Sequence, residues 1–176
     1  LPAVFVLYTA YRYAWGERMV GLSLALVGLT STVVAAALTG PLVKRLGERR
    51  TLLIGLAAGI TGLSAFGLAP STRWFFVGLP FTSLWGLVGP AIQALMTRRA
   101  GPSAQGQLQG ALSSMRGISG MIGPILYTQI LTFSIQHEGD VSLPGMPYLV
   151  AAGLLVASAM VAVLVTRSEE TDPARA

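Results

Sequence analysis

Long apolar stretches alternate with short polar connections along this chain. Five stretches are long enough to cross a bilayer, and they lie at about 19–39, 51–69, 74–96, 107–135 and 147–166. A crossing helix needs about 20 apolar residues for roughly 30 Å of hydrocarbon. The shorter apolar stretch 1–10 covers about half of that thickness, so we expect it to be the end of a truncated helix. The pattern predicts an all-α integral membrane protein.

Basic residues are divided unequally between the two sets of connections. One side carries eight of them: Lys44, Arg45, Arg49, Arg50, Arg98, Arg99, Arg167 and Arg175. The other side carries three, which are Arg12, Arg18 and Arg73. Because short cytoplasmic loops carry the excess of Lys and Arg, the first side and the tail 167–176 are predicted to be cytoplasmic.

Composition supports a membrane setting and excludes several functions. Only 11% of the residues are charged, whereas soluble domains carry about 25%. The net charge of +5 comes from residues between apolar spans rather than from a basic helix face with aromatics, which argues against nucleic-acid binding. The chain has no cysteine and one histidine, His137, so we expect no thiolate site, no histidine-rich metal site and no cofactor. Motifs of enzymes are also missing.

Small residues and prolines punctuate the predicted spans. Glycines recur every three or four residues in two of these regions: Gly55, Gly59 and Gly62, then Gly106, Gly110, Gly117, Gly120 and Gly123. Such stripes let helix backbones approach closely in lipid. They indicate either tight helix packing or a sliding surface in a moving bundle. Proline removes a helical hydrogen bond, so kinks are expected at Pro80, Pro90 and Pro124.

Arg116 is the one ionisable residue deep inside a predicted span. A charge near the bilayer centre costs about 2.5–3.5 kcal/mol, so such a residue usually faces the protein interior or water. No acidic residue lies in any predicted span, so its partner is a substrate, water, a backbone carbonyl or a missing part of the protein. Its role is therefore either in transport or in a structural ion pair. Residues at helical spacing from Arg116 predict a polar face along a pathway: Gln109, Ser113, Ser119, Gly120, Gly123 and Tyr127.

Three further side chains are candidates for the wall of a cavity. Gln93 is the only long polar residue of its span and either joins two helices or contacts a substrate. Ser31 lies in the run 30–32, whose hydroxyls either line the cavity or bond back to their own helix. Trp85 either stacks on an aromatic substrate or packs against a neighbouring helix.

The connection between the first two full spans carries a recognisable motif. It reads GPLVKRLGERR, and the residues that fit the pattern G-x-L-x-D-R-x-G-R-[RK] are Gly40, Leu42, Arg45, Gly47 and Arg49. This resembles the basic loop motif of the major facilitator superfamily. Lys44 stands where the aspartate is usual, and Glu48 where a basic residue is usual.

A second segment narrows the resemblance. Residues 89–124 contain P-A-I-Q-A, Q-G-Q-L-Q-G and I-G-P, which look like pieces of the proton-coupled tetracycline efflux antiporters. The resemblance covers nearly the whole chain and implies a fold of two six-helix halves around a central cavity. It implies that this chain is the C-terminal half, with 1–10 as the end of helix seven and a missing N-terminal half as its partner.

The resemblance also implies a function. The chain is expected to be part of a secondary active transporter in the inner (plasma) membrane, with a cytoplasmic C-terminus. It would export drugs or other small molecules using the proton gradient and confer antibiotic resistance. Gly59 and Ser31 stand where the tetracycline group has an aspartate and a histidine, so a multidrug or other exporter is an equal alternative to a tetracycline exporter. The alternative from another class is a non-transporting membrane fragment or interaction module.

Overall fold

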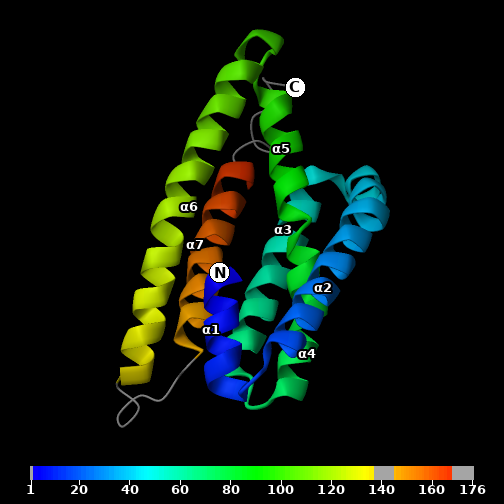
Figure 1. Ribbon diagram of the computed structural model, residues 1–176. Coiled ribbons are helices and arrows are strands. Elements are labelled where there is room, and N and C mark those ends of the chain that lie inside the picture. The colour runs from blue at the N-terminus through cyan, green and yellow to red at the C-terminus, as the bar shows by residue number, and fades with distance from the viewer. Residues whose placement is uncertain (1, 137–144, 168–176) are drawn as a thin grey trace.

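Helices make up the regular structure of the chain. The computed structural model describes residues 2–136 and 145–167. In these ranges the order of elements is α1 (Pro2–Tyr13), α2 (Glu17–Val33), a π-helical turn (Val34–Leu38), α3 (Thr39–Leu68), α4 (Thr72–Trp85), α5 (Val88–Arg99), a 3-10 turn (Pro102–Ala104), α6 (Gln105–Gln136) and α7 (Met146–Arg167). The long helices lie side by side (Figure 1), and four helical stretches of the described residues are long and apolar enough to cross a membrane. The expected all-α membrane fold is confirmed.

The first of these stretches doubles back on itself. Glu17–Leu68 contains 52 residues, and a straight helix of that length would measure about 78 Å, more than twice the thickness of the bilayer core. The chain reverses at Gly47, whose φ of 80° and ψ of 164° are accessible essentially only to glycine. Figure 1 shows α2 rising to one end of the bundle and α3 returning from it. The expected connection 41–50 is therefore helical apart from Gly47.

The predicted span 74–96 is two helices rather than one. α4 ends at Trp85 and α5 begins at Val88. Between them the amides of Gly86 and Leu87 donate to the carbonyls three residues earlier, at 3.1 and 3.0 Å, which makes a tight turn. Pro90 has no N–H with which to reach the carbonyl of Gly86, so an uninterrupted α-helix cannot form here. The kink expected from Pro90 is confirmed, whereas Pro80 and Pro124 remain inside α4 and α6.

The glycine stripe of α3 brings this helix against α4 and α5. A Cβ added to Gly55 would lie 2.8 Å from the side chain of Val88, and one added to Gly59 would lie 2.8 Å from that of Trp85. Gly62 lies equally close to α4. Larger residues would hold these helices apart, so this stripe serves tight packing.

Aromatic side chains form the core at the opposite end of the bundle from Gly47. Phe66 and Phe75 stack with their ring centres 4.1 Å apart. Tyr8 of α1 packs against Phe75 and donates its hydroxyl to the carbonyl of Phe66 at 3.2 Å. Tyr148, at the start of α7, packs edge-on against Tyr8 and Phe66. These contacts join α1, α3, α4 and α7.

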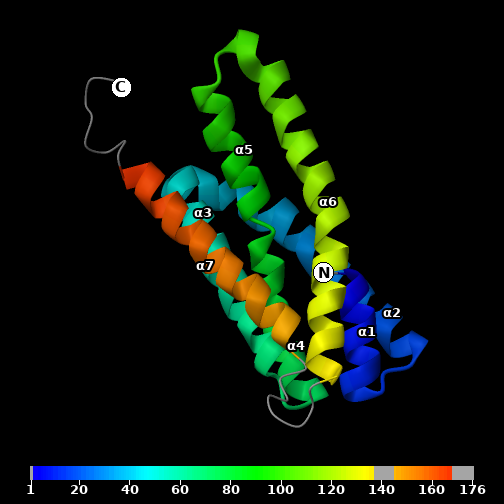
Figure 2. The same cartoon turned by 90° about the vertical axis from the view of Figure 1, so that its left-hand side faces the viewer.

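α6 stands partly clear of the other helices. Its later half approaches α1 and α7, and its earlier half diverges from them (Figure 2). Met115 and Met121 are 65% and 76% exposed. Among the described residues, no atom lies within 4 Å of a Cβ added to any of four glycines of α6, Gly106, Gly110, Gly117 and Gly120. The stripe of α3 is therefore covered, whereas that of α6 is open.

Some predicted segments fall wholly or partly outside the described residues. These are residue 1, the segment 137–144 with His137, and the tail 167–176 beyond its first residue. The truncated helix expected at 1–10 continues to Tyr13 as α1.

Candidate functional site

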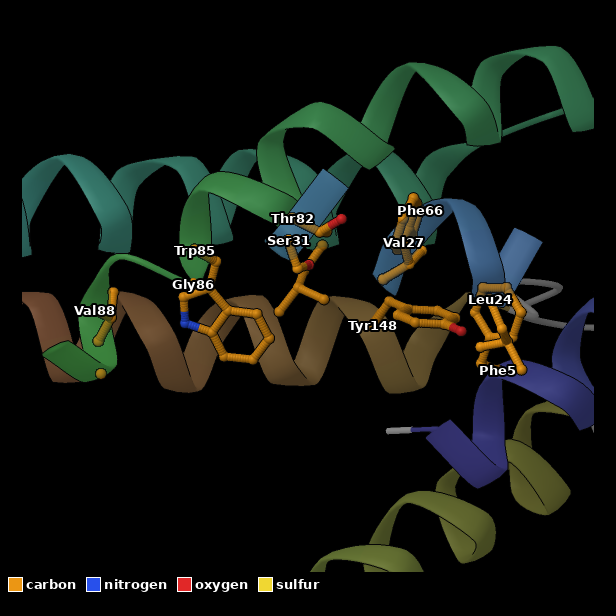
Figure 3. A pocket seen from close by; sticks show the side chains of 12 residues that line it. Phe5, Leu24, Val27, Ser31, Phe66, Thr82, Trp85, Gly86, Val88 and Tyr148 are labelled. Carbon is orange, nitrogen blue, oxygen red and sulfur yellow. The ribbon is translucent and has the colours of Figure 1, made fainter. Parts of the chain in front are cut away.

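One hollow has a volume of about 750 Å³ and lies among α1 to α5 and α7. Its lining is mainly apolar and aromatic: Phe5, Leu24, Val27, Ser31, Leu63, Phe66, Thr82, Trp85, Gly86, Val88, Gly89 and Tyr148. Figure 3 shows Trp85 and Val88 at one end and Phe5 and Leu24 at the other. Ring faces and branched chains on this wall suit an apolar, planar molecule.

Two of the predicted cavity residues line this hollow. Ser31 faces it from α2, and Trp85 faces it from the last position of α4. The two residues next to Ser31 in the sequence make hydrogen bonds within and between helices instead. Thr30 lies 2.7 Å from the hydroxyl of Ser83 in α4, and Thr32 donates to the carbonyl of Gly28 in its own helix at 2.8 Å. The run 30–32 therefore divides between cavity lining, helix pairing and back-bonding.

Tyr148 is a lining residue that the sequence did not single out. The residue is 2% exposed, and its hydroxyl has no hydrogen-bond partner among the described residues. In Figure 3 the ring lies along the hollow. A buried hydroxyl without a partner is unfavourable, so this atom is a local cost of the packing of α7 against α1 and α3. No pattern in the sequence places Tyr148 at a cavity, because its position there depends on how α7 packs against α1 and α3.

A second hollow of about 470 Å³ lies between α5 and α6. Its lining consists of Gly89, Ile92, Gln93, Leu112, Met115, Arg116, Ser119 and Gly120. Three of the predicted site residues, Gln93, Arg116 and Ser119, are thus brought to one wall. Arg116 stays protonated, and the lining contains no acidic side chain, so this hollow has a positive electrostatic character.

Other members of the predicted polar face of α6 lie elsewhere. Gln109 and Ser113 are exposed on the earlier part of α6 and line neither hollow described above. Tyr127 is half-buried and packs against the aromatic core. Helical spacing aligned these residues correctly, but only Arg116, Ser119 and Gly120 come opposite α5.

Gly89 belongs to the lining of both hollows. It lies in the first turn of α5, directly after the break between α4 and α5. A Cβ added to Gly89 would meet no atom of the described residues within 4 Å. The two hollows are therefore neighbours, and the backbone of Gly89 separates them without a side chain.

The loop motif lies at the end of the bundle where α3, α5 and α7 converge. Arg49 donates from Nε to Oγ1 of Thr166 in α7 at 3.0 Å. Glu48 accepts an ion pair from Nε of Arg98 in α5 at 3.1 Å. The reversal at Gly47 turns both side chains towards these helices. Gly40, Leu42 and Arg45 precede it in α3, where Gly40 and Arg45 are exposed and Leu42 is half-buried.

Within the described ranges no group of His, Cys, Asp and Glu side chains is arranged to hold a metal ion. A bundle of membrane-length helices with an aromatic hollow and a basic hollow defines a polytopic membrane protein. The chain belongs to the Major Facilitator Superfamily, whose family model matches residues 1–176.

Three similar curated proteins are all tetracycline resistance proteins. The tetracycline resistance protein, class G, of Vibrio anguillarum is 40% identical over 128 residues, which cover 73% of this chain and 33% of the relative. The class C protein of Escherichia coli is 31% identical, over 86% of this chain and 37% of the relative. The class E protein of Escherichia coli is 32% identical, over 92% of this chain and 39% of the relative. The matches thus span between 33% and 39% of the length of these relatives. No solved structure matches it significantly.

Proposed function

We propose that this chain is the C-terminal half of a secondary active transporter that exports small organic molecules in exchange for protons. The observation that carries the proposal is the meeting of Gln93, Arg116 and Ser119 at one hollow between α5 and α6. Polar and charged side chains inside a membrane bundle mark a pathway for a substrate or ion. Relatives named as tetracycline resistance proteins support a drug-like substrate.

The N-terminal half of the transporter is the proposed partner of the open face of α6. Met115, Met121 and Ile125 are all more than half exposed on this helix, and its glycines permit a close approach. The lipid bilayer covers the remaining apolar surface. The relatives are roughly three times as long as the match, which leaves room for a second half.

Protons are the proposed energy source, and no bound cofactor is needed. Arg116 does not release its proton at physiological pH, so it is not the proton carrier. The described acidic residues, Glu17 and Glu48, lie at ends of the bundle helices rather than inside the hollows. Carboxylates of the other half would therefore carry the proton. The basic end, with Arg49 and Arg98, is proposed to face the cytoplasm of a cell with this protein in its inner membrane.

Proton movement in everted membrane vesicles tests the proposal. The full-length gene product is expressed, the lumen is acidified by respiration, and a panel of drugs including tetracycline is added outside. The expected result is drug-dependent release of protons from the lumen, detected with a pH-sensitive dye. Arg116→Gln should reduce this release, whereas Arg73→Gln, a matched change of an exposed arginine in α4, should not. Failure of every compound with the protein present in the membrane would reject proton-coupled drug export and favour a non-transporting role.

A further inference from the structure

The aromatic hollow and the basic hollow adjoin at a residue without a side chain. Both linings include Gly89, and the space around its Cα is open. In the aromatic hollow, Trp85 and Val88 lie at the end nearest Gly89 (Figure 3). In the basic hollow, Gln93 lies one helical turn beyond Gly89 on the same helix. A single molecule can therefore contact Trp85 and extend past Gly89 towards Arg116.

The two hollows differ sharply in chemistry. The aromatic hollow is walled mainly by apolar and aromatic side chains, such as Phe66 and Trp85. The basic hollow adds the guanidinium of Arg116 and the amide of Gln93. A ligand matching both has an apolar, planar body and one polar end.

The polar end of the ligand is expected to be anionic, because the linings of the two hollows contain an arginine and no carboxylate side chain. Neither lining contains an aspartate or glutamate. A charge inside a membrane bundle usually acquires a partner, and the planar guanidinium pairs best with a group that accepts two parallel hydrogen bonds. Carboxylates and sulfonates are such groups, and the amide N–H of Gln93 adds a further donor.

We infer that the two hollows form one site for an amphipathic aromatic anion, with its ring system beside Trp85 and its carboxylate or sulfonate on Arg116. This inference names the substrate class for the proposed exporter and in that respect rests on the proposed function. The site itself is defined by binding, which needs neither a proton gradient nor transport. A binding experiment therefore tests the site, and the proton-release experiment tests the proposed export.

A matched pair of fluorescent probes distinguishes the contribution of the anionic group to binding from that of the aromatic rings. 1-Anilinonaphthalene-8-sulfonate and N-phenyl-1-naphthylamine share one ring system, and only the first carries a sulfonate. Both become fluorescent in apolar sites. Their dissociation constants are measured on the full-length gene product in lipid nanodiscs, with the signal of empty nanodiscs subtracted.

Arg116→Gln should raise the dissociation constant of the sulfonate about tenfold, because a hydrogen-bonded charge contact is lost. The dissociation constant of the neutral probe should change by less than about twofold in the same variant. Arg116→Lys should restore most of the sulfonate binding. Gly89→Leu should also weaken the sulfonate selectively, since its side chain would fill the junction. Trp85→Ala should weaken both probes. Arg73→Gln should change neither.

Two results would overturn the inference. One is unchanged sulfonate binding in Arg116→Gln, which would mean that another segment of the protein neutralises Arg116. The other is an equal loss of both probes in Arg116→Gln, which would assign Arg116 to folding. Thermal unfolding of each variant is measured alongside, and Gly89→Ala replaces Gly89→Leu if the larger side chain prevents folding. Sulfonate selectivity without drug-dependent proton release would reject the proposed antiport and retain the site.

Discussion

The indole ring of Trp85 lies directly against Gly59, so closely that a Cβ on Gly59 would sit 2.8 Å from both Cγ and Cδ1 of the ring. The same Cβ would sit 3.0 Å from Cδ1 of Leu155 in α7. The resemblance to the tetracycline group leads us to expect Gly59 at the position of an aspartate in that group. In this protein the space for such a side chain is filled by Trp85, which also forms the wall of the aromatic hollow. Trp85 thus both packs against α3 and lines the hollow.

Enlarging Gly59 should therefore destabilise the protein. Gly59→Ala is expected to lower the free energy of unfolding by about 1–3 kcal/mol, because the ring carbons nearest the backbone of Trp85 cannot move aside cheaply. The matched control is Gly21→Ala in α2, where an added Cβ meets no described atom within 4 Å. Equilibrium unfolding in mixed micelles measures both. Equal stability of the two variants would contradict the close contact.

The reversal between α2 and α3 should depend on glycine at position 47. Gly47→Ala is expected to cost about 1–3 kcal/mol of unfolding free energy, because an L-residue is strained at the φ of 80° found there. Gly40→Ala is the control in the same motif, since Gly40 has ordinary helical geometry and open space around it. That change should be neutral or stabilising by up to about 1 kcal/mol. A Gly47→Ala variant as stable as Gly40→Ala would refute the assignment of the turn.

The ion pair between Glu48 and Arg98 should contribute little to stability. The side chain of Arg98 is 75% exposed and that of Glu48 13%, so solvent screens the pair. A double-mutant cycle with Glu48→Gln and Arg98→Gln is expected to give a coupling energy below about 1 kcal/mol. High salt should reduce it further. A coupling of several kcal/mol would mean that the pair is shielded in the membrane-bound protein.

Removing the unpaired hydroxyl of Tyr148 should not harm the fold. Tyr148→Phe keeps the ring contacts with Tyr8 and Phe66 and deletes a buried polar atom that has no partner. The ligand-free protein is expected to be as stable as the wild type or more stable by about 1 kcal/mol. Tyr13→Phe provides the contrast, because the hydroxyl of Tyr13 donates to the carbonyl of Ala69 at 2.9 Å. Thermal unfolding should rank Tyr148→Phe above Tyr13→Phe, and the reverse order would show that the Tyr148 hydroxyl is paired.

Much of the fold was predictable because membrane crossing is a local property. The spans expected at 107–135 and 147–166 agree closely with α6 and α7, since the bilayer dictates the length of an apolar run. The span expected at 74–96 lies within the membrane-length stretch Thr72–Arg98, but two helices make up this stretch. Its hydropathy is continuous across Gly86, so only the missing N–H of Pro90 indicated the break.

The candidate site was predicted only in part. Helical spacing placed Ser119 and Gly120 on the face of Arg116, and the structure brings all three to one hollow. The same spacing included Gln109 and Tyr127, which lie away from it. Spacing identifies a face of one helix, but the neighbour opposite each turn of that face depends on how the helices diverge. The glycine stripes had two interpretations for the same reason, and α3 and α6 differ in whether another helix covers them.

By itself, the sequence determined the apolar crossings, the concentration of basic residues at one end and the resemblance to a transporter family. Each of these features depends on a short stretch of sequence. The free energy of moving side chains from water to lipid sets the crossings, and local helix geometry sets which residues share a face. Tertiary packing was needed to show that Trp85 fills the space beside Gly59, that Gly89 lines both hollows and that the hydroxyl of Tyr148 has no partner among the described residues. These features are distances between side chains on different helices, and such distances are set by packing rather than by any pattern along one helix.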